Sequence, residues 1–188
     1  MNNNLKEKIA ITTTRKPPSR VRQLVNELSP IIPNSFKIVR GHSNLQDLTE
    51  NAFSNSCTKI ILISSNHGNP ATLTGYKIIL DKNNIQLDWS FDWIIRNVKL
   101  NHEFGSKKVI NQVDNAQISF INIFSEIKEN FDNYFNFSKE LKGDKENLIR
   151  LTLEYTDPGF IFFPNNESNQ NISPIILMSE IILPDKTR

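Results

Sequence analysis

Two kinds of hydrophobic periodicity alternate along the first third of the sequence, and their order constrains the fold. Residues 8–14, KIAITTT, alternate apolar and polar side chains as a half-buried strand does. Two prolines follow, and then apolar side chains recur at helical spacing, at Val21, Leu24, Val25 and Leu28. A strand, a helix and a strand buried on both faces are predicted next, over residues 35–41, 44–53 and 59–65. Strands that alternate with helices indicate an α/β fold.

The rest of the chain continues this pattern less regularly. An antiparallel hairpin is predicted over residues 74–91, and the polar stretch 96–108 is the best place for a seam between two halves. A strand (107–113), a long helix (118–135) and three strands (147–155, 159–164 and 173–183) should follow. We therefore expect an α/β fold, with an α+β organisation left open. No residue-level repeat is visible, so an internal duplication would be structural only.

Length and composition favour a single domain over residues 1–188, with half-domains at about 8–95 and 107–188 that share a core. Hydrophobic residues make up 38% and charged residues 22%, which suits a soluble globular protein. No apolar run approaches the length of a membrane span, and the N-terminus lacks the apolar stretch of a signal peptide. We expect a cytoplasmic protein. Cys57, the single cysteine, is expected to be a small, partly buried apolar residue.

The sequence lacks the usual signatures of enzymes and metal sites. Its six glycines form neither a phosphate-binding loop nor a dinucleotide fingerprint, and three histidines and one cysteine have no metal-ligand spacing. We predict no cofactor, no metal and no catalytic residue. The best exception is the loop Asn66, His67, Gly68, which follows a buried strand and could hold a ligand. The simpler interpretation is a tight turn that Gly68 permits.

Positive charge is concentrated near the N-terminus although the net charge is only +2. Residues 1–40 hold eight lysines and arginines against two acids. Four of the cations lie between Arg15 and Arg22, where the first strand gives way to the first helix. The unpaired N–H groups and the positive dipole end of a helix N-terminus favour an anion there, and Arg15 and Lys16 add full charges. This pattern indicates a polyanionic partner, and nucleic acid before a small phosphate.

The basic cluster also has two simpler interpretations. Arg20 or Arg22 could pair with Glu27 or with an acid elsewhere in the chain, as surface cations commonly do. The cluster could equally be an ordinary solvated face.

The same region carries a resemblance to a known family. Residues 11–48 resemble the opening of the Brix domain of ribosome-biogenesis proteins, through Thr13-Thr14-Arg15, Pro18-Ser19-Arg20, Pro33-Asn34 and Arg40-Gly41. Residues 60–80 resemble the family's strand, loop and hairpin around His67, Gly68 and Pro70. Residues 148–164 resemble its closing strand pair, here with Asp157-Pro158-Gly159-Phe160 at the turn, where the family's arginine is absent.

The resemblance implies two similar α/β halves, like the anticodon-binding domains of some tRNA synthetases, and ribosomal RNA binding without catalysis. A domain without long charged extensions resembles the archaeal form. Our hypothesis is an rRNA-binding factor in ribosomal subunit assembly and pre-rRNA processing, with ribosomal proteins or other assembly factors as further partners and no membrane. The predicted RNA contacts are Arg15, Lys16, Ser19, Arg20, Arg22 and Arg40. The alternatives are a protein–protein adaptor that uses an apolar strand edge at residues 159–163 and a small enzyme that uses His67.

Overall fold

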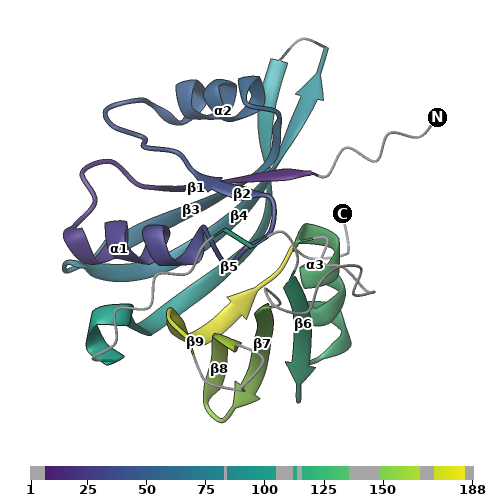
Figure 1. Cartoon of the computed structure of the whole chain (residues 1–188). Coiled ribbons are helices and arrows are strands. Elements are labelled where there is room, and N and C mark those ends of the chain that lie inside the picture. Colours follow the sequence, from purple (N-terminus) through teal and green to yellow (C-terminus); the bar gives the residue numbers. More distant parts are fainter. Residues whose placement is uncertain are drawn as a thin grey trace.

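The computed structural model describes residues 7–82, 84–104, 112–113, 116–135, 149–165 and 172–184. Within these ranges the chain forms one nine-stranded sheet and three α-helices (Figure 1). Strands and helices alternate from residue 8 to residue 66 as the periodicity predicts, and the expected α/β fold is confirmed. No helix in the described ranges has both the length and the apolar character to cross a membrane.

The first half contains seven of these elements. They are β1 (Lys8–Thr13), α1 (Ser19–Leu28), β2 (Ser35–Lys37), α2 (Leu45–Ser54), β3 (Cys57–Asn66), β4 (Asn69–Asp81) and β5 (Asn84–Lys99). The four residues predicted to form the apolar stripe of α1 are all buried. β2 is shorter than the predicted strand 35–41, because its residue-by-residue pairing with β1 ends at Lys37, opposite Ile11.

A short 3₁₀ helix, η1 (Asn101–Phe104), follows β5 in the predicted seam. The second half then contains β6 (Ala116–Ile121), α3 (Ser125–Phe135), β7 (Ile149–Thr156), β8 (Gly159–Asn165) and β9 (Ile175–Ile182). The predicted helix 118–135 is wrong at its start, since residues 118–121 form part of β6, which pairs in parallel with β7. The predicted strand 107–113 lies outside the described residues, apart from its last two positions.

The strand order is β2-β1-β3-β4-β5-β9-β8-β7-β6. In each half a parallel pair is followed by two antiparallel pairs: β1, β3, β4 and β5 in one, β6, β7, β8 and β9 in the other. The antiparallel pairing of β5 with β9 joins the halves into a single sheet. This order agrees with two similar halves, while the boundaries at 95 and 107 and the duplication itself stay predictions.

The strand that contains residues 159–163 is interior to the sheet. β8 pairs with β7 on one side and with β9 on the other, and Phe160 and Phe162 belong to the core. The prediction that this segment offers an exposed apolar edge is therefore wrong, because its apolar alternation reflects core packing. The outer strands of the sheet are β2 and β6.

Helices cover both faces of the sheet at β1. Ile9 and Ile11 belong to the large core that also contains the buried residues of α1 and α3. Ala10, between them in sequence, belongs to a smaller cluster with Ala52 of α2. Because successive side chains of a strand point to opposite faces, α1 and α2 lie on opposite sides of β1, as Figure 1 shows.

Helix α3 of the second half packs on strands of the first. Its Phe131 stacks on Trp93 of β5, with ring centroids 5.0 Å apart and planes 14° apart. The hydroxyl of Tyr134 lies within 2.8 Å of the carbonyl oxygen of Ile60 and 3.2 Å of that of Tyr76. Burial raises the pKa of Tyr134, so the hydroxyl stays a neutral donor.

We expect Tyr134→Phe to lower the free energy of unfolding by about 1–2 kcal/mol, because it removes a buried hydrogen bond and leaves the aromatic packing intact. Denaturant unfolding followed by circular dichroism measures the change. Tyr155→Phe is the matched control, since Tyr155 is half-buried and makes ring contacts with Phe124 and Phe160. Equal losses in the two variants would contradict the role of the Tyr134 hydroxyl.

Candidate nucleic-acid interface

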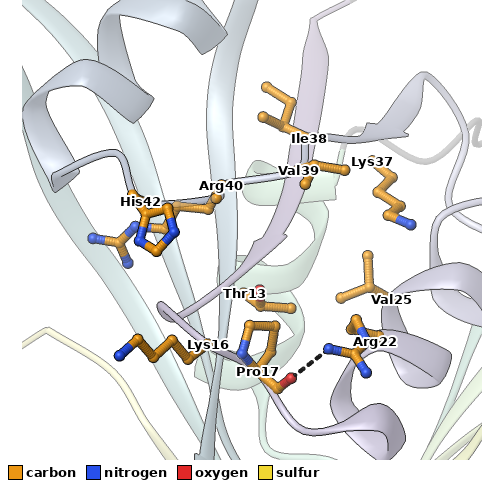
Figure 2. Close-up of a pocket in the computed structure, with 11 residues that line it drawn as sticks. Thr13, Lys16, Pro17, Arg22, Val25, Lys37, Ile38, Val39, Arg40 and His42 are labelled. Carbon is orange, nitrogen blue, oxygen red and sulfur yellow. Dashed lines mark hydrogen bonds between the residues drawn. The ribbon is translucent and has the colours of Figure 1, made fainter.

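The carboxyl ends of β1 and β2 meet at one edge of the sheet, and the chain leaves them toward opposite faces. β1 leads to α1 on the face of the large core, and β2 leads to α2 on the other face. In open α/β sheets this reversal creates a crevice in which ligands bind. A cavity of about 320 Å³ lies there (Figure 2), lined by Thr13, Lys16, Pro17, Arg22, Val25, Lys37, Ile38, Val39, Arg40, Gly41 and His42.

Hydrogen bonds to β1 fix the segment that follows β2. The backbone N–H of Ile38 donates to the carbonyl oxygen of Ile11 at 2.9 Å. The Thr12 hydroxyl donates to the carbonyl oxygen of Ile38, also at 2.9 Å. Both bonds hold the backbone of Ile38, the residue directly before Val39 and Arg40. They therefore determine where these two residues enter the wall of the pocket.

Positive side chains surround the pocket. Figure 2 shows the cations Arg22 and Lys37 on one side of it, and the cations Lys16 and Arg40 together with the imidazole of His42 on the other. No aspartate or glutamate lines the pocket. The two ion pairs found in the described part of the chain, Arg20 with Glu103 and Lys59 with Glu7, involve none of these cations. Their positive charges therefore add to one another.

Neutral acceptors hold three of these cations in place. A guanidinium nitrogen of Arg22, Nη1, donates to the carbonyl oxygen of Pro17 at 2.9 Å. The Lys37 ammonium donates to Oδ1 of Asn26 at 2.8 Å. Arg40 Nε donates to the carbonyl oxygen of Ser43 at 3.2 Å. These contacts orient the side chains without neutralising them, so the pocket is prepared for an anion.

Arg15 lies beside the pocket and adds to its charge. Its Nε donates to the same Ser43 carbonyl oxygen that Arg40 uses, also at 3.2 Å. Burial, and next the positive charge of Arg15, lower the pKa of Arg40. An anion between the two guanidinium groups would relieve their repulsion, and the bidentate geometry of arginine suits a phosphate.

The structure brings together most of the residues predicted to bind RNA, but not all of them. Lys16, Arg22 and Arg40 line the pocket, and Arg15 lies next to it. Ser19 opens α1, is exposed and does not line the pocket. As RNA contacts, all of these residues remain predictions.

Arg20 has other partners. Its guanidinium pairs with the Glu103 carboxylate at 2.8 Å and donates to the carbonyl oxygen of Val98. The sequence leaves open a pairing with an acid elsewhere in the chain, and Glu103 is that acid. Glu27 instead accepts the backbone N–H of Asn101, at 3.0 Å. Arg20 thus connects α1 to the end of β5 and to η1.

Sequence reasoning missed two charged or titratable residues of the pocket, Lys37 and His42. Both belong to the segment KIVRGH, residues 37–42, which also contains the predicted Arg40. The usable signal was topological: when β1 and β2 are parallel neighbours, the residues after β2 must lie beside those after β1. Counting charges along the sequence does not reveal that the residues after β2 lie beside those after β1.

The histidine loop forms a tight turn between β3 and β4. His67 and Gly68 have φ angles of 47° and 85°, and Asn66 pairs with Asn69 across the turn. Positive φ at both central residues is typical of a type I′ hairpin turn, which agrees with the simpler interpretation of this loop. Cys57 is buried, more completely than the sequence-based expectation of partial burial, and burial raises the pKa of its thiol to about 11. The described residues contain no cluster of three or more metal-ligating side chains.

Comparison with known proteins identifies relatives of one consistent kind. The chain is 27% identical over 165 residues to a probable Brix domain-containing ribosomal biogenesis protein of Sulfurisphaera tokodaii, covering 83% of this chain and 88% of that protein. It is 36% identical over 63 residues to the U3 small nucleolar ribonucleoprotein protein imp4 of Schizosaccharomyces pombe, covering 34% of this chain and 22% of that protein. In several other archaeal Brix domain-containing proteins, the matched region spans only 38% to 46% of their length.

The fold is also found among solved structures. The crystal structure of a probable ribosomal biogenesis protein from Aeropyrum pernix K1 superposes with a TM-score of 0.76 at 20% identity, over 94% of this chain and 99% of that one. No protein-family model matches the chain. The resemblance to the Brix domain that the sequence indicates is nevertheless confirmed by these relatives.

The Arg20–Glu103 pair gives a pH-dependent prediction. Slight burial raises the pKa of Glu103. The hydrogen bond from the N–H of Leu100 and the Arg20 guanidinium together lower it by more, so the pKa of Glu103 lies below its ordinary value. A carboxyl with a lowered pKa in the folded state stabilises the protein above its unfolded-state pKa, and this stabilisation is lost as pH falls.

We expect Glu103→Gln to lower the free energy of unfolding by about 1 kcal/mol at pH 7. The difference from wild type should shrink steadily as the pH falls below about 4.5. Denaturant unfolding from pH 7 to pH 3 measures both effects. Glu180→Gln, an exposed carboxyl on β9, serves as the control. A difference that is independent of pH would contradict the assignment.

Proposed function

Because the chain is a relative of Brix domain-containing ribosomal biogenesis proteins, we propose that it is a non-catalytic rRNA-binding factor. It acts in ribosomal subunit assembly and pre-rRNA processing, in the cytoplasm, by binding pre-rRNA and holding it in place. Its partners are ribosomal RNA and, beside it, ribosomal proteins or other assembly factors. The name of the imp4 relative, a ribonucleoprotein protein, supports an RNA-containing assembly.

One observation carries the proposal: the crevice between β1 and β2 is lined by four cations and a histidine and by no acid. RNA presents a row of phosphates, and Lys and Arg side chains that neutralise them release bound counterions. Lys16, Arg22, Lys37 and Arg40 are the phosphate contacts within the pocket, and Arg15 is a further contact beside it. Contacts of this kind position the RNA and carry little sequence information.

A second function, a protein–protein adaptor in the same pathway, is favoured by the outer strand of the sheet that the described residues form. β6 is an outer strand, and near it Ile121 and Phe124 are 42% and 67% exposed. An unpaired strand edge with apolar side chains is a site for strand addition. A complex with a ribosomal protein that survives ribonuclease and is lost in Ile121→Lys would favour this function over RNA binding.

We expect the double variant Lys16→Ala/Arg40→Ala to bind fragments of the cell's rRNA at least about tenfold more weakly near 100 mM salt. Its plot of log K against log salt should be shallower than that of wild type by about 1 to 2 units, because two phosphate contacts are lost. Filter binding or fluorescence anisotropy over a salt series measures both quantities.

The matched control removes the same charge elsewhere. Lys77→Ala/Arg150→Ala deletes two exposed cations from β4 and β7, outside the pocket. It should leave the affinity and the salt slope close to those of wild type. If both double variants weaken binding equally, the attraction is a property of the overall charge and the proposed interface is wrong.

A further inference from the structure

The walls of the β1–β2 pocket combine charged groups with apolar ones. Pro17, Val25, Ile38 and Val39 contribute apolar surface between the cations. Val39 is 76% exposed, the largest exposure among the large apolar side chains in the described ranges. Its position in the pocket wall, one residue before Arg40, places an apolar contact next to a phosphate-binding group.

The volume of the pocket is larger than phosphate binding requires. At about 320 Å³ it falls at the lower end of the range for sites that enclose small organic molecules. A phosphate on the cations would leave most of this space, and the apolar wall, without a contact. A ligand that fills the pocket and uses its whole lining would carry an uncharged group as well as an anionic one.

Planar side chains are also present. His42 and Arg40 line the same side of the pocket as Lys16 (Figure 2). Imidazole rings and guanidinium planes are surfaces on which unstacked RNA bases lie, whereas the bases of a continuous A-form duplex remain stacked inside the helix. The side chains of this pocket therefore fit an unpaired nucleotide better than a paired one.

We propose that the β1–β2 pocket binds one unpaired nucleotide of RNA, with the phosphate on Arg22, Lys37 and Arg40 and the base against Val39 and His42. This inference rests on the proposed function of RNA binding, and it adds the chemical form of the RNA that this site selects. The same chemistry is offered by a free mononucleotide, so the test must separate the two sources.

The test uses the full chain and the double variant Val39→Ala/His42→Ala. Both side chains are exposed, so the variant should fold, and it leaves every lysine and arginine of the pocket in place. Leu80→Ala, which truncates a 59% exposed side chain on β4 away from the pocket, is the control. Affinity is measured for a single-stranded oligoribonucleotide and for a fully paired RNA duplex of equal length. Equilibrium dialysis with AMP, GMP, CMP and UMP forms the third arm.

We expect the double variant to bind the single strand about tenfold more weakly, because the base loses its contacts. Its affinity for the duplex and its salt slope should equal those of wild type. An unchanged affinity for the single strand, or an equal loss for both RNAs, would overturn the nucleotide pocket and leave RNA binding by the cations intact.

Two further results separate this inference from the proposed function. If wild type binds the mononucleotides tightly and neither RNA, a free nucleotide is the ligand, and both the RNA source and the RNA-binding function are wrong. If wild type binds none of the three ligands, the pocket and the proposed function fail together. The Lys16→Ala/Arg40→Ala variant, which lacks phosphate contacts, must lose affinity for both RNAs if the function is correct.

Discussion

Strand β5 is the element on which the rest of the structure depends. Residues 84–94 of this strand pair with β4, and residues 92–99 pair with β9. A single strand therefore belongs to the sheets of both halves and makes them continuous. Its Phe91 and Trp93 also point into the large core, where they contact Phe131 of α3. Losing this strand would separate the two halves and expose the aromatic centre of the protein.

The candidate interface depends on whether its cations are paired with acids or with neutral hydrogen-bond acceptors. Elsewhere in the described residues, Arg20 and Lys59 each have an acidic partner. In the pocket, the side chains of Arg22, Lys37 and Arg40 donate instead to carbonyl and amide oxygens. Such acceptors fix the geometry of the side chains but leave the field of the cations intact, so the donors of the pocket are already oriented before any anion binds.

Local patterns predict the elements of this fold well because local physics forms them. The stripe at Val21, Leu24, Val25 and Leu28 predicts α1, and all four residues are buried as expected. The error at residues 118–121 has an equally local origin. Ile118 and Phe120 suit a strand face, but Phe120 is also in helical register with Ile123, Phe124, Ile127 and Phe131. Only the parallel pairing with β7 decides between the two, and the partner strand lies about thirty residues away.

Long-range neighbours explain what the sequence could not provide about the site. The Arg20–Glu103 pair joins residues 83 positions apart, and no pattern near Arg20 distinguishes it from Arg22. Lys37, Val39 and His42 enter the pocket through the pairing of β1 with β2, which is a property of the sheet. Conversely, the basic joint between β1 and α1 was predictable, because its cations are close together along the chain itself.

The near-repetition of strand order has a consequence for the ends of the sheet. Beyond the β1–β3 pair the first half adds β2, whereas β6 ends the sheet beyond β7 with nothing further in the described residues. The three residues of β2 thus help to form the crevice at one end of the sheet, whereas at the other end β6 is the outer strand of the described sheet. A sheet whose strand order nearly repeats has, in this way, two unlike ends. Because its two ends differ, a particle that contacts both ends of the sheet can do so in only one orientation.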